Sequence, residues 1–254
     1  MKASEKPNES LVLPGVNTLL ALSWQIFKKE PYTFLGFSGW LFVPIVLNLL
    51  ANIVLPTQFD ALADTAFSIV AYGILSIWVV VAMTITTRQI VTQKTNDSIA
   101  ISRLAWQFLI PYLLATILTS FLNLVGFALL VVPGILFYVW YAFAPIIILI
   151  EGGGFIEAFH KSKALVKGRF GAIFWRLVGG NLAIGLAYLS LFLLLTSLYL
   201  TSSDLGLEAY LNSPVSLVDQ IITAAIDVTI LPMFVIYSTV LYLETKKEPR
   251  TQPI

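Results

Sequence analysis

The chain has 254 residues, of which 58% are hydrophobic and only 11% are charged. A soluble domain carries roughly 25% charged residues, so this chain lacks the polar surface of a water-soluble globule. A formal net charge of +1 offers no basic surplus for phosphates, which argues against a nucleic-acid partner. The chain has no cysteine, and His160 is its one histidine. Disulfides, thiolate chemistry, catalytic triads and histidine metal sites are therefore not expected, and neither is a cofactor.

Long uncharged runs predict an all-α polytopic membrane protein with six transmembrane helices, in a single domain covering residues 1–254. About 20 apolar residues are needed to cross the hydrocarbon core of a bilayer. The predicted spans lie at about residues 34–55, 66–87, 108–131, 135–150, 173–200 and 220–243. The uncharged run from Phe108 to Ile150 is too long for one helix. Pro133-Gly134 is its natural break, because proline removes a backbone donor and glycine permits a turn.

Short amphipathic segments precede three of these spans and predict helices that lie in the membrane interface. Their expected bounds are about 15–29, 98–107 and 155–167. Such a helix places its apolar face in the lipid boundary and its lysines, for example Lys28 and Lys29, among the headgroups. Aligning Ser23 with Ser162 suggests three repeats of a surface helix followed by a two-span hairpin. The alternative is that any two amphipathic connectors align.

The basic residues predict the orientation of the chain. All 15 Lys and Arg residues fall before the first span, between spans two and three, between span four and the start of span five (Arg176), or after span six. Acidic residues mark the opposite connections, namely Asp60, Asp64, Asp204, Glu208 and Asp219. Because short cytoplasmic loops carry an excess of Lys and Arg, both termini are predicted to be cytoplasmic.

Four polar residues inside the predicted spans form a candidate intramembrane cluster: Asn48, Asn52, Asn123 and Asp227. At about 1.5 Å of rise per residue, all four fall near one depth in the outer half of the bilayer. Polar groups in lipid are costly and are functional-site hypotheses by default. One interpretation is a polar pocket open to the outer side. The other is helix–helix packing, in which amides bond across the bundle.

The stretch from 131 to 176 combines Pro-Gly, an apolar span, an acidic residue, three glycines and the pattern A-xxx-S-xx-LVKG. The motif residues are Pro133, Gly134, Glu151, Ala158, Ser162, Leu165, Lys167, Gly168 and Phe170. This stretch resembles a bacterial family of six-span integral membrane proteins. The family includes the membrane domain of some glycerophosphodiester phosphodiesterases and related uncharacterised inner-membrane proteins. The resemblance implies a fold and the bacterial inner (plasma) membrane. It does not imply hydrolase activity, because the soluble phosphodiesterase domain is absent.

We therefore expect a non-enzymatic multi-pass inner-membrane protein with an accessory or structural role in the envelope. Membrane lipids are the expected partners, and other membrane proteins are a second, open class of partner. The alternative function is a transporter or lipid-handling protein that uses the intramembrane polar cluster. Substrate, partner proteins and oligomeric state are not predicted.

Two residues near the surface allow sharper predictions. Gly168 is expected to end the third surface helix in a left-handed conformation, which glycine adopts without a steric penalty. Glu151 closes the fourth span at a helix C-terminus, where the macrodipole disfavours an anion. We expect it to form a partly buried ion pair with Lys161, Lys163 or Arg169. The alternative is a carboxylate solvated among the headgroups.

Overall fold

The computed structural model describes residues 13–54, 61–94, 97–203, 210 and 217–247, without the side chains of residues 48 and 51–69. Every regular element in this part of the chain is helical. The elements are α1 (Val16–Lys29), α2 (Pro31–Gly39), the 3₁₀ turn η1 (Trp40–Phe42), α3 (Val43–Val54), α4 (Ala61–Val91), α5 (Ser98–Leu129), α6 (Val131–Tyr141), α7 (Ala144–Glu151), α8 (Phe155–Val166), α9 (Phe170–Ser203) and α11 (Leu217–Lys247). The all-α prediction is confirmed for these residues.

Five helical stretches in the described residues are long and apolar enough to cross a membrane. They are Val70–Val91 of α4, all of α5, Val131–Glu151 over α6 and α7, α9 and α11. The predicted first span, residues 34–55, corresponds to α2, η1 and α3. In this region the apolar helical stretch whose side chains are described is Pro31–Leu47, which is shorter than the five stretches above. The architecture is consistent with a membrane protein, and six crossings stay a prediction.

The structure corrects the predicted break at Pro133-Gly134. The chain breaks at Leu130, whose φ of −170° and ψ of 160° are extended. Pro133 and Gly134 instead lie in the first turn of α6, where a missing N–H has little cost because the first helical donors have no intrahelical partner. The predicted fourth span, 135–150, is also interrupted, between Tyr141 and Ala144.

The predicted separate surface helix at 98–107 is also wrong. These residues are the start of the continuous helix α5. Asp97 caps that start, because its side chain accepts hydrogen bonds from the N–H groups of Ile99 and Ala100, at 3.0 and 3.4 Å. The segment contains no glycine or proline, so nothing in it ends the helix before the next predicted span. The other two surface helices exist as α1 and α8, and their position in a membrane interface stays a prediction.

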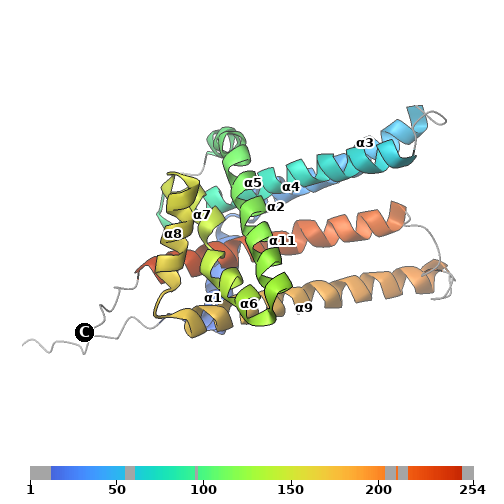
Figure 1. Cartoon of the computed structure of the whole chain (residues 1–254). Coiled ribbons are helices and arrows are strands. Elements are labelled where there is room, and N and C mark those ends of the chain that lie inside the picture. The colour runs from blue at the N-terminus through green and yellow to red at the C-terminus, as the bar shows by residue number, and fades with distance from the viewer. Residues whose placement is uncertain (1–12, 55–60, 95–96, 204–209, 211–216, 248–254) are drawn as a thin grey trace, which may run out of the picture.

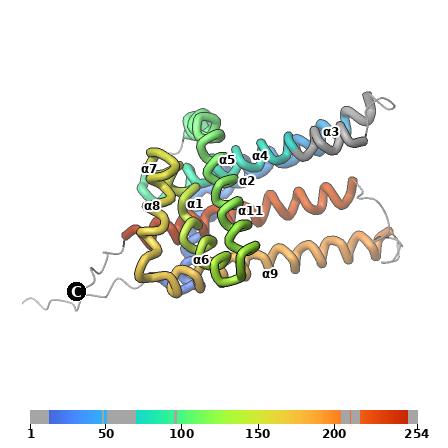
Figure 2. The backbone as a smooth tube through the Cα atoms, viewed as in Figure 1, coloured from blue at the N-terminus to red at the C-terminus, as the bar shows by residue number. Residues whose placement is uncertain are grey.

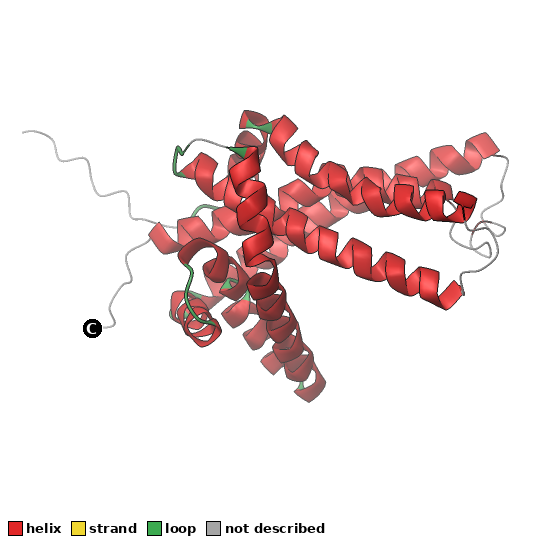
Figure 3. Cartoon of the chain, turned by 90° about the horizontal axis from the view of Figure 1, so that it is seen from above, coloured by secondary structure: helices red, strands yellow, loops and turns green. Residues whose placement is uncertain are grey.

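The long helices do not all run in one direction. Figure 1 shows α4, α9 and α11 extending the same way from the end of the molecule where α8 lies. Figure 2 draws the backbone as a tube from the same side and shows α1 and α8 near the C-terminal end of α11. The hairpin of α5 and α6 crosses these helices steeply. From above, one helical hairpin again stands out from the bundle at a steep angle (Figure 3).

The buried core lies toward the end of the bundle that carries the basic residues. In α7 every residue from Ala144 to Ile150 is buried, and α11 is most buried from Val235 to Tyr242. The outer faces of α5 and α9 are covered instead with exposed large apolar side chains, such as Ile117, Phe121, Leu186 and Leu193. Exposed apolar surface of this extent is typical of contact with lipid or with another protein.

Candidate functional site

Glu151, the last residue of α7, is the centre of a polar cluster at the basic end of the bundle. Its Oε2 accepts a bond from Lys161 Nζ of α8 at 2.9 Å. Its Oε1 accepts from Lys246 Nζ at 2.7 Å and from the Tyr242 hydroxyl at 2.6 Å, both of α11. The side chain is only 18% exposed. The predicted partly buried ion pair of Glu151 is thus confirmed, with Lys161 as its partner, and the cluster joins three helices.

The other two predicted partners of Glu151 bond elsewhere. Lys163 Nζ lies over the Trp140 ring, 4.4 Å from its centroid. Arg169 donates to the carbonyl oxygens of Leu165 and Thr245, at 3.2 and 3.1 Å. Sequence reasoning missed Tyr242 and Lys246, since nothing local places α11 beside α7.

Lys161 is shared between two carboxylates. It also pairs with Glu157, one helical turn earlier in α8, at 2.8 Å. This hydrogen bond lowers the pKa of Glu157 below its ordinary value. The hydrogen bonds that Lys161 donates, first to Glu157 and then to Glu151, raise the pKa of Lys161. Both side chains therefore stay charged around neutral pH, and the cluster is an ionic one.

A cavity of about 330 Å³ adjoins this cluster. Its lining residues come from α7, α8, α11 and the turn before α9: Ile147, Glu151, Lys161, Leu165, Arg169, Tyr242 and Lys246. Three of them are cationic and one is anionic. The cavity therefore has a net positive lining with an apolar wall.

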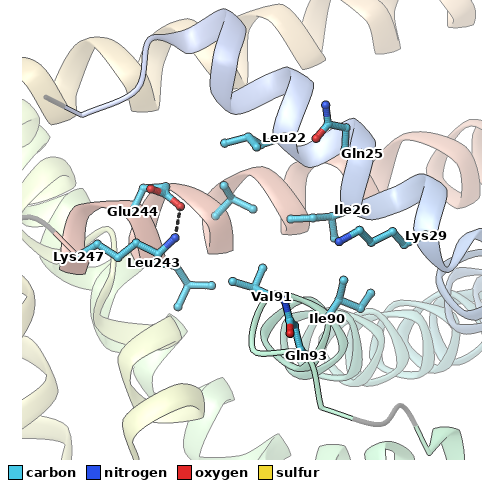
Figure 4. Close-up of a pocket in the computed structure, with 11 residues that line it drawn as sticks. Leu22, Gln25, Ile26, Lys29, Ile90, Val91, Gln93, Leu243, Glu244 and Lys247 are labelled. Atoms are coloured by element: carbon cyan, nitrogen blue, oxygen red, sulfur yellow. Dashed lines mark hydrogen bonds and ion pairs between the residues drawn. The ribbon is translucent and has the colours of Figure 1, made fainter. Parts of the chain in front are cut away.

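A second cavity of about 220 Å³ lies between α1, the end of α4 and the end of α11 (Figure 4). Its apolar lining is Leu22, Ile26, Ile90, Val91, Val240 and Leu243, and its polar lining is Gln25, Lys29, Gln93, Glu244 and Lys247. Lys247 pairs with Glu244 at 2.6 Å. Within the described part of the chain, Lys29 has no ion-pair partner. We call this cavity the α1–α11 groove.

Ser162 explains one residue of the family-like motif. It is fully buried in α8, opposite the break between α6 and α7. Its hydroxyl donates to the Trp140 carbonyl at 2.6 Å and accepts from the Phe143 N–H at 3.3 Å. The break leaves these two backbone groups without helical partners, and Ser162 satisfies both. Its aligned counterpart Ser23 is also fully buried, but it donates to Leu19 of its own helix, at 2.7 Å.

Other motif residues form turns, a helix cap or packing contacts. Gly168 has φ of +82°, which confirms the predicted left-handed turn after α8. Ala158 is buried, and Leu165 packs on the core beside it. Pro133 and Gly134 form the first turn of α6, and Lys167 caps the end of α8. The motif therefore describes how α8 is joined to the bundle, rather than a catalytic constellation.

Of the four residues in the predicted intramembrane cluster, the structure describes the side chains of Asn123 and Asp227. Asp227 of α11 accepts a hydrogen bond from the Tyr72 hydroxyl of α4 at 2.5 Å, and Tyr188 of α9 also interacts with it. Asn123 lies on α5, which packs against α4, α6 and α7. Its amide oxygen is buried, with no hydrogen-bond partner among the described residues. Asn48 and Asn52 lie on α3, with side chains outside the described set.

No group of three His, Asp or Glu side chains in the described residues could hold a metal ion. Comparisons with protein-family models, with curated proteins and with solved structures find no match to this chain.

Proposed function

We propose that this chain is a non-enzymatic multi-pass protein of the bacterial inner membrane, with an accessory role in which its cytoplasmic face binds inner-leaflet lipids. One observation carries the proposal: the cationic residues gather at one end of the helices, beside two cavities with apolar walls. A phospholipid presents the complementary chemistry, because its anionic headgroup continues directly into apolar chains.

The proposed orientation places both termini in the cytoplasm. All 15 basic residues then lie on or near the cytoplasmic side. The number of crossings is even in this arrangement, and it is six if each predicted span crosses.

The α1–α11 groove is the better candidate for a headgroup. Lys29 and Lys247 flank it from different helices, and its apolar wall continues toward the bundle. In Figure 4 the Lys29 and Lys247 side chains approach the groove from opposite sides. Its volume of about 220 Å³ suits a headgroup rather than a whole lipid. In the groove Lys247 pairs with Glu244 and Lys29 has no ion-pair partner among the described residues, whereas in the other cavity Lys161 and Lys246 both pair with Glu151.

The test is to extract the protein in polymer nanodiscs and to quantify the co-purified lipids and proteins by mass spectrometry. A Lys29→Gln, Lys247→Gln double variant should lose enrichment of anionic phospholipid over the bulk membrane. Lys94→Gln, which removes an exposed cation outside both cavities, is the matched control. Equal lipid profiles for all three proteins would refute headgroup binding at the groove.

A transporter is the second candidate, and the contact between Asp227 and Tyr72 favours it. A carboxylate held by a tyrosine between transmembrane helices is an arrangement that transporters use for protons and cations. If transport is the function, Asp227→Asn and Tyr72→Phe should abolish the phenotype rescued by the wild-type gene at unchanged protein level. If both variants rescue fully, Asp227 serves packing only.

A further inference from the structure

The hairpin of α5 and α6 is apolar at its tip, where a membrane-crossing pair would meet water. No charged residue lies between Arg103 and Glu151. The tip reads Phe-Ala-Leu-Leu-Val-Val over residues 127–132. Leu129, Leu130, Val131 and Val132 are each 65% to 70% exposed. A tip with this exposure is stable in hydrocarbon and unfavourable in water.

The other two predicted outer connections have a different composition. The first carries Asp60 and Asp64, and the last carries Asp204, Glu208 and Asp219. These are the residues expected where a chain emerges from lipid into water. Only the α5–α6 connection lacks any polar side chain, so its environment is expected to differ from theirs.

The turn at the tip is short, and two backbone hydrogen bonds span it. It consists of one residue, Leu130, whose N–H donates to Gly126 O at 3.2 Å. The N–H of Gly134 donates to Leu130 O at 3.2 Å, and Pro133 has no N–H to satisfy. The two glycines let the helices approach closely, because a Cβ on Gly134 would lie 2.3 Å from the Phe127 ring. These two bonds and the proline lower the number of unpaired N–H groups at the turn, which reduces the cost of placing it in hydrocarbon.

The direction of the hairpin also differs from that of the other helices. Figure 1 shows it crossing α9 and α11 steeply, so that it does not follow them toward their far ends. The first arm, α5, starts near the basic end with Arg103. The second arm, α6, leads back through α7 to Glu151 and its lysine partners at that end.

We propose that α5 and α6 form a re-entrant hairpin, which enters the bilayer from the cytoplasmic side, turns among the lipid acyl chains at Leu130 and returns to the same side. Four helical segments then cross the membrane: α2 to α3, α4, α9 and α11. The even number of crossings keeps both termini on one side, so the distribution of basic residues is the same as for six spans. This inference rests on the proposed membrane insertion and orientation.

The first test uses the absence of cysteine in the chain. Leu130→Cys is treated with a membrane-impermeant maleimide in intact cells and in inverted vesicles. We expect no labelling from either side beyond the background of the cysteine-free protein. Ser202→Cys should label from outside, and Lys163→Cys should label only in inverted vesicles. Labelling of Leu130→Cys from outside overturns the re-entrant hairpin, whereas failure of the Ser202 and Lys163 controls overturns the orientation instead.

The second test identifies what surrounds the tip. Leu130→Cys is labelled with bimane in detergent and reconstituted into phosphatidylglycerol–phosphatidylcholine vesicles. Nitroxide placed deep on the acyl chain should quench the bimane more strongly than nitroxide on the headgroup. No quenching by acyl-chain nitroxide would mean that a second copy or another protein covers the tip, and it overturns the proposal.

A third test places a charge at the tip and measures the amount of membrane-inserted protein, without any labelling. Leu130→Lys should reduce the amount of membrane-inserted protein, because the lysine would lie in hydrocarbon. Ser202→Lys, at the end of α9, should leave that amount unchanged. Equal, wild-type amounts of both variants would place the tip in water and contradict the hairpin.

Discussion

At the scale of single residues, Glu151 shows how a carboxylate is tolerated at the C-terminus of a helix. The macrodipole opposes a negative charge there, and two lysines and one tyrosine compensate for it. We expect Glu151→Gln to lower the stability in detergent by about 1–3 kcal/mol, because hydrogen bonds to a charged, half-buried group are strong ones. A thermal unfolding midpoint measured by fluorescence checks this.

The matched control is Glu157→Gln. That residue shares Lys161 with Glu151, but its side chain is 57% exposed. Exposed ion pairs contribute little to the stability of a fold, so the unfolding midpoint of Glu157→Gln should stay close to the wild-type value. Equal shifts for the two variants would contradict a special role for Glu151.

Gly168 allows a second prediction at this scale. Its φ of +82° is a left-handed conformation, and no atom lies within 4 Å of a Cβ placed there. Gly168→Ala should therefore cost about 1–2 kcal/mol through backbone strain alone. Gly171→Ala, two residues into α9 and also in open space, should be neutral or slightly stabilising. If both variants unfold at the same temperature, the turn makes no special backbone demand.

Both of these features could be predicted from the sequence because each depends on near neighbours. Gly168 follows an amphipathic segment directly, and Glu151 lies ten residues before Lys161. Tyr242 and Tyr72 could not be predicted as partners of Glu151 and Asp227. These pairs are separated by 91 and 155 residues, and no local pattern reports such a contact.

At the scale of elements, Ser162 links the surface helix α8 to the break between α6 and α7. Ser162→Ala would leave the Trp140 carbonyl and the Phe143 N–H buried and unpaired. We expect a loss of about 1–3 kcal/mol in unfolding free energy, which is the usual cost of such groups. Ser190→Ala is the control, since its hydroxyl is exposed and bonds only within α9. A neutral Ser162→Ala would show that this link is not needed.

The packing of α9 on α11 depends on another close approach. A Cβ on Gly180 would lie 2.0 Å from the ring of Tyr237, whose hydroxyl donates to Arg176 O at 2.6 Å. Gly180→Ala should therefore destabilise by about 1–3 kcal/mol through overpacking. Gly185→Ala in the same helix has open space and should not destabilise. Circular dichroism during heating, in the same detergent, compares the two.

The boundaries of the helices are harder to predict from the sequence than the helices themselves. The apolar runs predicted the five long apolar helical stretches, since length and composition decide them. The break at Leu130 was missed because the expectation rested on Pro133, and a proline in the first turn of a helix is compatible with that helix. The helix at 98–107 was wrongly separated from the next span, because amphipathic spacing does not mark where a helix stops.

At the scale of the whole molecule, one physical pattern sets the proposed orientation. Basic residues and the polar cluster around Glu151 lie at one end, and the apolar faces of α5 and α9 cover much of the remaining surface. Composition could predict this distribution. It could not predict the direction of the α5–α6 hairpin, because an uncharged run fits both a crossing pair and a re-entrant one.

The orientation itself makes the last prediction, which uses single-cysteine variants spread over the chain. Cysteines replacing Thr57, Asp64 and Ser202 should react with an impermeant maleimide in intact cells. Those replacing Ser4, Asn96, Lys163 and Thr251 should react only in inverted vesicles. Of these positions only Ser202 and Lys163 have described side chains, so the others test the sequence argument alone. The physical reason is that cytoplasmic loops retain Lys and Arg. Reaction of Lys163→Cys from outside would invert the molecule and would move the α1–α11 groove away from the inner leaflet.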